Sequence, residues 1–267
     1  MKNFTTKHDT QSLSTPKPTS HKWQNGSVLV IGGSHRYHGA PLLAVSAAAR
    51  FVDIVHFACD ENYKKILPRM RGKLFEFIPV FSRELKTYVN HVDVVLLGPG
   101  LELHAKNQKL VRSIQKQFPK KRLIFDAGAF RLADLNALHD QCIVSPNQKE
   151  FLDIFGATRS PKLVKKYAKK FRCTILAKGP ISYIASPTAY AENHTGNQGL
   201  TKGGTGDVLA GLLAAFFTKN NPFLSAKAAS FLLGKTAEQL WESRGYAFSA
   251  TDLLQDIPLV FRKLTHP

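Results

Sequence analysis

The stretch Thr201-Lys202-Gly203-Gly204-Thr205-Gly206-Asp207, followed by the apolar run 208–217, is the part of the sequence that decides the fold. Its glycines let backbone N–H groups converge on one point, and the helix that follows adds the positive end of its dipole. The turn therefore predicts an anion hole suited to a phosphoryl group, with Asp207 at its mouth as a proton acceptor. Asp207 could instead be a simple helix N-cap, a role in which Asp is favoured.

Short apolar runs alternate with amphipathic stretches through most of the chain. Such runs are typical of buried parallel strands, and the stretches between them are typical of crossover helices. We therefore predict an α/β fold with a mostly parallel central sheet. The expected strands are residues 28–31, 54–58, 92–97, 123–125, 143–144, 174–177, 181–185 and 189–192, and the expected helices are 41–50, 106–116, 147–155, 163–171, 207–217, 222–243 and 250–264.

Two further glycine turns follow predicted strands. Gly32-Gly33-Ser34 comes directly after residues 28–31, and Gly98-Pro99-Gly100 comes directly after residues 92–97. Each turn alone is a routine feature. In open α/β sheets, however, ligands bind at the carboxyl ends of the strands. Together with the turn at 203–207, these segments predict a ligand site at one edge of the sheet.

Length and composition indicate one large domain. The chain has 267 residues, 43% of them hydrophobic, which is enough for a core on both faces of a sheet. We divide it into a flexible polar leader at 1–20 and a single domain at 21–267. The leader is rich in Thr, Ser, Lys and Pro and has no apolar periodicity, so we expect it to lie outside the fold.

The formal net charge of +18 draws anions to the surface. A polyphosphate ligand, a nucleic acid and an acidic lipid would each suit such a charge. The sequence lacks a zinc spacing, a basic region with heptads and an aromatic RNA-binding strand, so small-molecule anions are favoured as partners over nucleic acid. The lysine-rich faces of residues 106–116 and 163–171 are interpreted as solvated helix surfaces.

Cysteine usage and hydropathy predict a cytoplasmic location. Cys59, Cys142 and Cys173 are odd in number and lie in apolar runs, which favours reduced core thiols over disulfides. No apolar stretch approaches the roughly 20 residues that a bilayer span requires, and residues 1–20 lack the apolar segment of a secretory signal. We expect no membrane partner.

The motifs, taken in order, resemble those of the ADP- or ATP-dependent NAD(P)H-hydrate dehydratase family. The resemblance implies a ribokinase-like fold, in which a three-layer sandwich places helices on both faces of the sheet. It also implies a repair reaction, in which the nucleotide phosphorylates the hydroxyl of a hydrated nicotinamide ring and loss of phosphate regenerates NADH or NADPH. The matching segments are Val28-Leu29-Val30-Ile31-Gly32-Gly33-Ser34, Gly39-Ala40-Pro41, Gly98-Pro99-Gly100-Leu101, Lys178-Gly179, Thr195-Gly196-Asn197, Gly203-Gly204-Thr205-Gly206-Asp207-Val208-Leu209-Ala210-Gly211 and Ala250-Thr251-Asp252-Leu253-Leu254.

The resemblance assigns roles to the matching residues. Asp207 would be the catalytic base and would contact the hydroxyl of the hydrate, while the glycine turn would hold the phosphoryl group. Lys178 could also be a solvated lysine at a strand end. The implied nucleotide-binding residues are Lys178, Gly179, Pro180, Ile181, Ser182, Gly203, Gly204, Thr205 and Gly206, and the implied hydrate-binding residues are Ala40, Gly100, Asn147 and Asp207.

The implied co-substrate is ADP or ATP, and the implied substrate is NADH hydrate or NADPH hydrate. Phosphoryl transfer requires Mg²⁺ to neutralise the phosphate charges. Because clustered carboxylates are lacking, we expect the nucleotide to hold this ion, with no metal site built from protein ligands. Glu150 is the one acid that could contribute, although it could equally be solvated. The resemblance also implies a homo-oligomer, in the form of a tetramer.

Three departures from the family pattern fall on the substrate side, and one of them is Phe51-Val52-Asp53, which stands where the family has Gly-Ala-Gly. Asn147 stands where the family has a His, and Asp126-Ala127-Gly128 stands where the family has Asp-Ala-Asp. They leave two alternatives open, namely a ribokinase-like kinase with a stable phosphate ester as product and a nucleotide-binding sensor without turnover. A nucleic-acid role that rests on charge alone is the least favoured reading.

Overall fold

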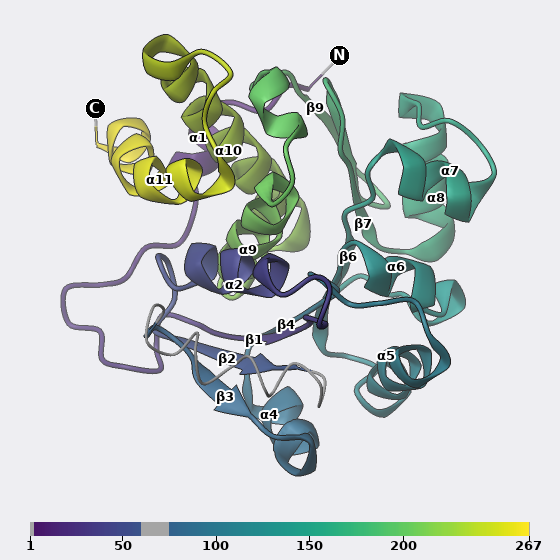
Figure 1. The fold of residues 1–267 in the computed structure, drawn as a ribbon. Coiled ribbons are helices and arrows are strands. Elements are labelled where there is room, and N and C mark those ends of the chain that lie inside the picture. The colour runs from purple at the N-terminus through teal and green to yellow at the C-terminus, as the bar shows by residue number, and fades with distance from the viewer. Residues whose placement is uncertain (1–2, 60–74, 267) are drawn as a thin grey trace.

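A nine-stranded sheet forms the centre of the computed structural model, which describes residues 3–59 and 75–266 (Figure 1). The strand order is β3-β2-β1-β4-β5-β6-β7-β8-β9. Neighbours from β3 to β7 are parallel, whereas β8 pairs antiparallel with both β7 and β9. The strands are β1 Ser27–Ile31, β2 Ile54–Ala58, β3 Ile78–Val80, β4 Val94–Leu97, β5 Arg122–Phe125, β6 Cys142–Val144, β7 Thr174–Ala177, β8 Ser182–Ala185 and β9 Tyr190–Asn193.

Helices cover both faces of this sheet (Figure 1). Successive side chains of a strand point to opposite faces. In β1, Val28 and Val30 belong to one hydrophobic core, and Leu29 and Ile31 belong to the other. The predicted three-layer α/β sandwich is therefore confirmed. One layer holds α1 Lys7–Gln11, α2 Gly39–Ala48, α9 Thr205–Phe217, α10 Pro222–Arg244 and α11 Ala250–Thr265, and the other holds α4 Leu85–His91, α5 Ala105–Gln117, α6 Gly128–Leu132, α7 Gln148–Phe155 and α8 Pro161–Phe171.

Glycines bring three strand ends into contact at the carboxyl edge of the sheet. A Cβ atom on Gly32, after β1, would lie 2.1 Å from the carbonyl oxygen of Pro99, after β4. A Cβ atom on Gly98 would lie 1.8 Å from the carbonyl oxygen of Asp126, after β5, and Gly98 also has a positive φ of +129°. Only glycine meets both demands without strain. The turns after β1, β4 and β5 therefore pack directly against one another.

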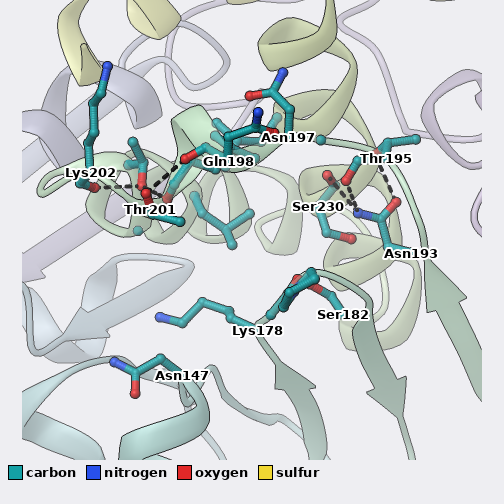
Figure 2. A pocket seen from close by; sticks show the side chains of 18 of the residues that line it. Asn147, Lys178, Ser182, Asn193, Thr195, Asn197, Gln198, Thr201, Lys202 and Ser230 are labelled. Carbon is teal, nitrogen blue, oxygen red and sulfur yellow. Dashed lines mark hydrogen bonds between the residues drawn. The ribbon is translucent and has the colours of Figure 1, made fainter. Parts of the chain in front are cut away.

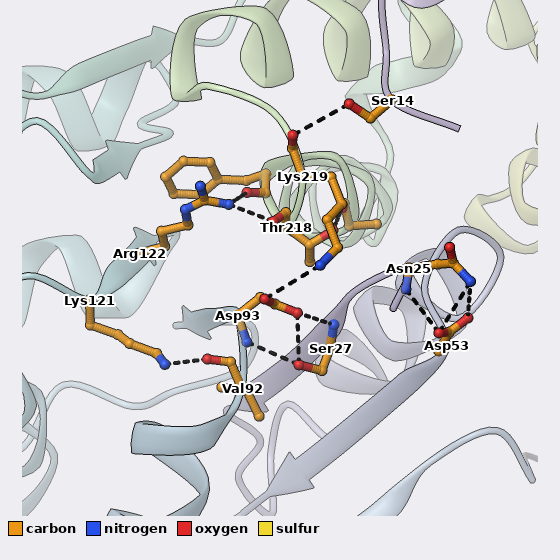
Figure 3. Close-up of polar contacts among 12 residues, drawn as sticks. Ser14, Asn25, Ser27, Asp53, Val92, Asp93, Lys121, Arg122, Thr218 and Lys219 are labelled. Atoms are coloured by element: carbon orange, nitrogen blue, oxygen red, sulfur yellow. Dashed lines mark hydrogen bonds and ion pairs between the residues drawn. The ribbon is translucent and has the colours of Figure 1, made fainter. Parts of the chain in front are cut away.

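The opposite edge of the sheet is held by local hydrogen bonds (Figure 3). Asp93, just before β4, accepts hydrogen bonds from the backbone N–H of Ser27 (2.8 Å) and from its hydroxyl (3.0 Å). Arg122 donates to the carbonyl oxygens of Phe217 (2.8 Å) and Thr218 at the C-terminal end of α9. A cation is favourable at that end of a helix dipole. With its C-terminus anchored here, α9 directs its N-terminus toward the carboxyl edge.

Sequence reasoning missed β3 and the short helices α4 and α6, and it shifted several boundaries. β3 contains Pro79, which usually argues against a strand but is tolerated because β3 lies at the edge of the sheet. β4 begins at Val94, two residues later than predicted, because Asp93 is engaged with Ser27. Three short 3-10 turns also escaped prediction: η2 Ser82–Glu84, η3 Leu135–Ala137 and η4 Gln198–Thr201.

The prediction that residues 1–20 lie outside the fold is wrong for residues 3–13, the N-terminal segment below. The backbone N–H of Thr5 donates to the carbonyl oxygen of Glu192 (2.9 Å), which adds a parallel bridge beside β9. Asp9 in α1 forms an ion pair with Lys227 of α10, in which the side chains are only 7% and 14% exposed. Leu13 is buried in the core. Local composition could not reveal this docking, because every partner lies far along the chain.

Two further expectations concern thiols and membranes. Cys142 and Cys173 are buried, Cys59 is half-buried, and the three cysteines form no disulfide. Among the helices formed by residues 3–59 and 75–266, none combines the length and the apolar character that crossing a bilayer would take.

Candidate active site

The glycine turn forms the N-terminus of α9. Gly204 is the N-cap residue, with a left-handed backbone at φ +92°. The hydroxyl of Thr205 lies 2.7 Å from the carbonyl oxygen of Leu200 and 2.9 Å from that of Lys202, so it anchors the turn. Asp207 is the third residue of the helix and is therefore not its N-cap.

Four charged side chains from different elements meet beside this helix end. Nζ of Lys178, after β7, lies 2.6 Å from Oδ1 of Asp126, after β5. The hydroxyl of Ser145 donates to the same carboxylate oxygen at 2.7 Å. Glu150 of α7 and Asp207 both interact electrostatically with Asp126 and Lys178. We call Asp126, Glu150, Lys178 and Asp207 the charged cluster.

Burial and neighbouring charges set the ionisation of this cluster. Burial raises the pKa of Asp207 to about 7, and the carboxylates of Asp126 and Glu150 add to the rise while Lys178 opposes it. Burial disfavours the charge of Lys178, but Asp126 and Glu150 outweigh that effect, so the pKa of Lys178 is raised. The cluster thus places a permanent cation beside a carboxyl group that exchanges its proton near neutral pH. A general base needs this property.

A cavity of about 680 Å³ opens beside the charged cluster. Figure 2 shows Lys178 reaching between Asn147 and the loop at 195–202. A Cβ atom on Gly206 would lie 3.9 Å from Nζ of Lys178, so the ammonium group also faces the first turn of α9. Lys202 also lines the cavity, but its side chain extends away from Lys178 and donates to the carbonyl oxygen of Phe248 (2.6 Å). The cavity volume of about 680 Å³ is within the usual range for small-molecule sites.

Most of the predicted nucleotide-binding residues line this cavity. They are Lys178, Gly179, Pro180, Ser182, Thr205 and Gly206. Gly203, Gly204 and Ile181 are not among the lining residues. Gly203 and Gly204 shape the turn, and the carbonyl oxygen of Ile181 accepts a hydrogen bond from Arg159 at 2.7 Å.

The predicted hydrate-binding residues divide between two regions. Asn147 lines the cavity, and its side chain accepts a hydrogen bond from the backbone N–H of Glu150 (2.9 Å) as part of the capping box of α7. Gly100 packs near Pro41, because a Cβ atom there would lie 3.2 Å from Cδ of Pro41, the residue after Ala40. Ala40 and Gly100 thus lie together in what we call the glycine-turn region, the turns at residues 32–41 after β1 and 98–100 after β4, and they do not line the cavity.

Asp126 links these two regions, and the predicted site residues did not include it. Its carboxylate binds Lys178, which lines the cavity, and its carbonyl oxygen packs against Gly98 in the glycine-turn region. The signal was present in the sequence, because Asp126 directly follows the predicted strand 123–125. Gly128 has a packing reason as well: a Cβ atom there would lie 2.2 Å from the carbonyl oxygen of Leu101, so an Asp would not fit without a shift.

The charged cluster does not form a metal site by itself. Across residues 3–59 and 75–266, no group of three or more His, Cys, Asp or Glu side chains is placed to hold a metal ion. The carboxylate of Asp126 is already paired with Lys178. A Mg²⁺ ion here would therefore take most of its ligands from nucleotide oxygens and water.

The sheet order, the antiparallel pairs of β8 and the glycine turn at the start of α9 belong to a ribokinase-like α/β fold. A ribokinase-like superfamily protein from Enterococcus faecalis has the same fold, with a TM-score of 0.87 over 99% of this chain and 97% of that chain at 24% sequence identity. The model of the NAD(P)H-hydrate dehydratase family matches residues 28–259. The chain belongs to this family.

Curated relatives match nearly the whole chain. The ADP-dependent (S)-NAD(P)H-hydrate dehydratase of Nitrosopumilus maritimus is 31% identical over 287 residues, which cover 98% of this chain and 97% of the relative. The bifunctional NAD(P)H-hydrate repair enzyme Nnr of Methanocaldococcus jannaschii is 33% identical over 264 residues, which cover 95% of this chain and 52% of the relative. The chain therefore spans about half the length of the bifunctional relatives that it matches.

Proposed function

We propose that the protein is an enzyme that repairs hydrated nicotinamide cofactor, using ADP or ATP to dehydrate the (S)-hydrate of NADH or NADPH. The observation that carries this proposal is Asp207. It presents a carboxyl group with a pKa of about 7 in the first turn of α9, within a charged cluster beside a cavity of about 680 Å³. The Nitrosopumilus maritimus relative, which the chain covers almost end to end, is named an ADP-dependent (S)-NAD(P)H-hydrate dehydratase, and this name supports the same substrates.

The first chemical step is phosphorylation of the hydroxyl on the hydrated ring. Asp207 accepts the hydroxyl proton as the ring oxygen forms a bond to the terminal phosphorus of the nucleotide. The bond between that phosphorus and the rest of the nucleotide breaks, so AMP leaves from ADP or ADP leaves from ATP. The N–H groups at the start of α9 and the ammonium of Lys178 stabilise the negative charge on the transferring group.

The second step is elimination of phosphate. Hydroxide is a poor leaving group, whereas phosphate leaves readily with the electron pair of the C–O bond. The ring nitrogen donates its lone pair to the carbon that loses phosphate, and loss of a proton from the neighbouring ring carbon restores the double bond of NADH or NADPH. The overall result is removal of water from the hydrate at the expense of one phosphate bond.

The layout of the site suits two substrates that meet at the charged cluster. The nucleotide would occupy the cavity along residues 178–182, with its terminal phosphate at Gly206 and Lys178 and with Mg²⁺ held by its phosphate oxygens. The hydrate would approach from the glycine-turn region that holds Ala40 and Gly100. Asn147 borders the cavity and would contact the hydrate only where the two substrates adjoin.

The decisive assay follows recovery of NADH or NADPH absorbance from prepared hydrate with Mg²⁺ and either nucleotide. We expect Asp207→Asn to lower kcat by roughly 10²- to 10⁴-fold, the usual contribution of a general base. Asp252→Asn is the matched control. Asp252 also holds the third position of a helix, α11, but hydrogen bonds from Ser249 lower its pKa, so it is ionised at neutral pH. This control should keep near wild-type activity, and equal rates for Asp207→Asn and wild type would contradict the proposal.

The same assay separates the two alternatives. A kinase would consume nucleotide and leave the phosphate on a stable product, without release of inorganic phosphate or recovery of absorbance. A sensor would bind nucleotide and consume none. If the wild-type protein gave either result, the dehydratase proposal would be wrong and the corresponding alternative, kinase or sensor, would take its place.

We also propose a cytoplasmic homo-oligomer, a tetramer. Three cysteines that form no disulfide suit a reducing compartment. The outer faces of α10 and α11 expose Trp241 at 37% and Leu259 at 50%, and apolar side chains of this kind are common at subunit interfaces. Light scattering gives the mass in solution, and a monomer at assay concentration would contradict the assembly.

A further inference from the structure

Arg159 lies in the loop between α7 and α8 and has no part in the chemistry described above. Its Nη1 donates a hydrogen bond to the carbonyl oxygen of Ile181 at 2.7 Å. Its guanidinium group also lies over the ring of Tyr183, with Cζ 4.9 Å from the ring centroid. Arginine suits such a position because its planar group donates a hydrogen bond and stacks on a ring at the same time.

The same guanidinium group packs against Gly179. A Cβ atom at position 179 would lie 1.7 Å from Nη2 and 2.3 Å from Cζ of Arg159. Gly179 is not among the glycines with a positive φ, so its backbone conformation does not require glycine. A larger residue at position 179 would push the guanidinium aside, and the Arg159 side chain would then give up its contacts with Ile181 and Tyr183. Gly179 therefore lets the guanidinium keep both contacts.

These contacts fall on the segment that lines the cavity. Lys178, at the start of the segment, is fixed by its ion pair with Asp126 and by its backbone hydrogen bond to the carbonyl oxygen of Pro146 (2.8 Å). Ser182, at the other end, belongs to β8. Between these two fixed ends, Arg159 contacts residues 179 and 181 and is itself not among the residues that line the cavity.

We propose that Arg159 is a positioning residue that sets the affinity of the site for adenine nucleotide. It holds residues 178–182 in the shape that receives the nucleotide and touches neither substrate. This inference rests on the proposed function, because that function places the nucleotide in the cavity. It also reassigns Gly179, from a residue that approaches the nucleotide to one that accommodates Arg159.

The test is a double-mutant cycle read by calorimetric titration of the purified protein with MgADP and MgATP. Arg159→Ala should raise Kd about tenfold or more, and Gly179→Ala should do the same in the wild-type background, because each removes the same support. The double variant should bind no more weakly than Arg159→Ala alone. In the hydrate assay, KM for nucleotide should rise in parallel while kcat at saturation stays within about threefold.

Two further variants keep the test sharp. Arg159→Lys retains the charge and is expected to fold, yet it should also raise Kd, because an ammonium group cannot stack and donate as the planar fork does. Arg112→Ala is the matched control. Arg112 lies on α5 and donates to the carbonyl oxygen of Leu132 at the end of α6 (3.3 Å), neither residue lines the cavity, and loss of this contact should leave Kd unchanged.

The outcomes separate this inference from the proposed function. If wild type binds nucleotide and the Arg159 variants bind equally well, the inference is wrong and the proposed function stands. If the Arg159 and Gly179 penalties multiply in the double variant, Gly179 contacts the nucleotide itself and the positioning role is wrong. If wild type binds neither nucleotide, both the inference and the proposed function are wrong.

Discussion

Asp207 meets two opposing demands within one side chain. Catalysis needs a carboxylate that can accept a proton near neutral pH, whereas folding favours the neutral acid in a half-buried position next to two other carboxylates. The rise of its pKa to about 7 measures this conflict. The protein therefore gives up stability at the residue on which the reaction depends.

Replacement of Asp207 by Asn should stabilise the fold while it removes activity. Folding raises the pKa of this carboxyl group from 3.8 to about 7, so the folded state binds the proton more tightly and stability falls as the pH rises between those values. Asn carries no charge and avoids this loss. We expect a gain of about 1–2 kcal/mol at about pH 8, a value reduced because the group is partly exposed, and a smaller gain at about pH 5. Urea unfolding at both pH values measures the gain, and an equal gain at both would contradict the raised pKa.

Functional residues could be identified from the sequence only where they belong to a local motif. Asp207 and Lys178 were identified because each belongs to a short pattern at the end of a predicted strand or the start of a predicted helix. Arg159 has no such pattern, since its role arises from contacts with residues more than a dozen positions away. The raised pKa of Asp207 also depends on Asp126 and Glu150, which reach the cluster only in the folded chain.

At the scale of elements, the N-terminal segment supports one wall of the cavity. The hydroxyl of Thr5 donates to the side chain of Asn193 at 2.6 Å, and Asn193 lines the cavity at the end of β9. The Nδ2 group of Asn193 in turn donates to the carbonyl oxygen of Ser230 in α10 (3.3 Å). Residues 3–13 thereby join the sheet edge to the helical layer.

The buried ion pair of this segment should contribute more to stability than an exposed pair on the same helix. Lys227→Met leaves the carboxylate of Asp9 buried without its partner, which should cost about 3 kcal/mol. Lys235→Met breaks a pair with Glu238 whose side chains are 39% and 34% exposed, so it should cost less than about 1 kcal/mol. Urea unfolding of both variants makes the comparison. Equal losses would show that the N-terminal segment adds little to the fold.

The long, periodic elements were predicted and the short or docked ones were not. Strands such as β1 and helices such as α9 carry continuous apolar runs that their own sequence reveals. β3 is three residues long and includes a proline, and α1 has a polar sequence that becomes ordered only against α10 and α11. Tertiary contacts determine whether such short elements form, and the local sequence propensity therefore does not predict them.

At the scale of the whole molecule, the two ends of the parallel strands differ in function. Hydrogen bonds of Asp93 and Arg122 hold one edge together (Figure 3), while glycine turns and the charged cluster shape the other for ligands. The net charge of +18 favours the approach of polyphosphates, and the exposed lysines of α8 contribute to it. The strand-end turns in the sequence predicted the ligand edge, whereas the hydrogen bonds at the other edge and the link that Asp126 makes between cavity and turns required the structure.

The central claim is that Asp207 acts as a general base with a pKa near neutrality, and the pH dependence of kcat/KM for the hydrate tests it most directly. We predict that kcat/KM rises through a single ionisation with a midpoint at about pH 7 or somewhat above, because bound phosphate adds further negative charge beside the carboxyl group. A rate independent of pH from about 6 to about 9, as an ordinary aspartate of pKa about 4 would give, would contradict the claim.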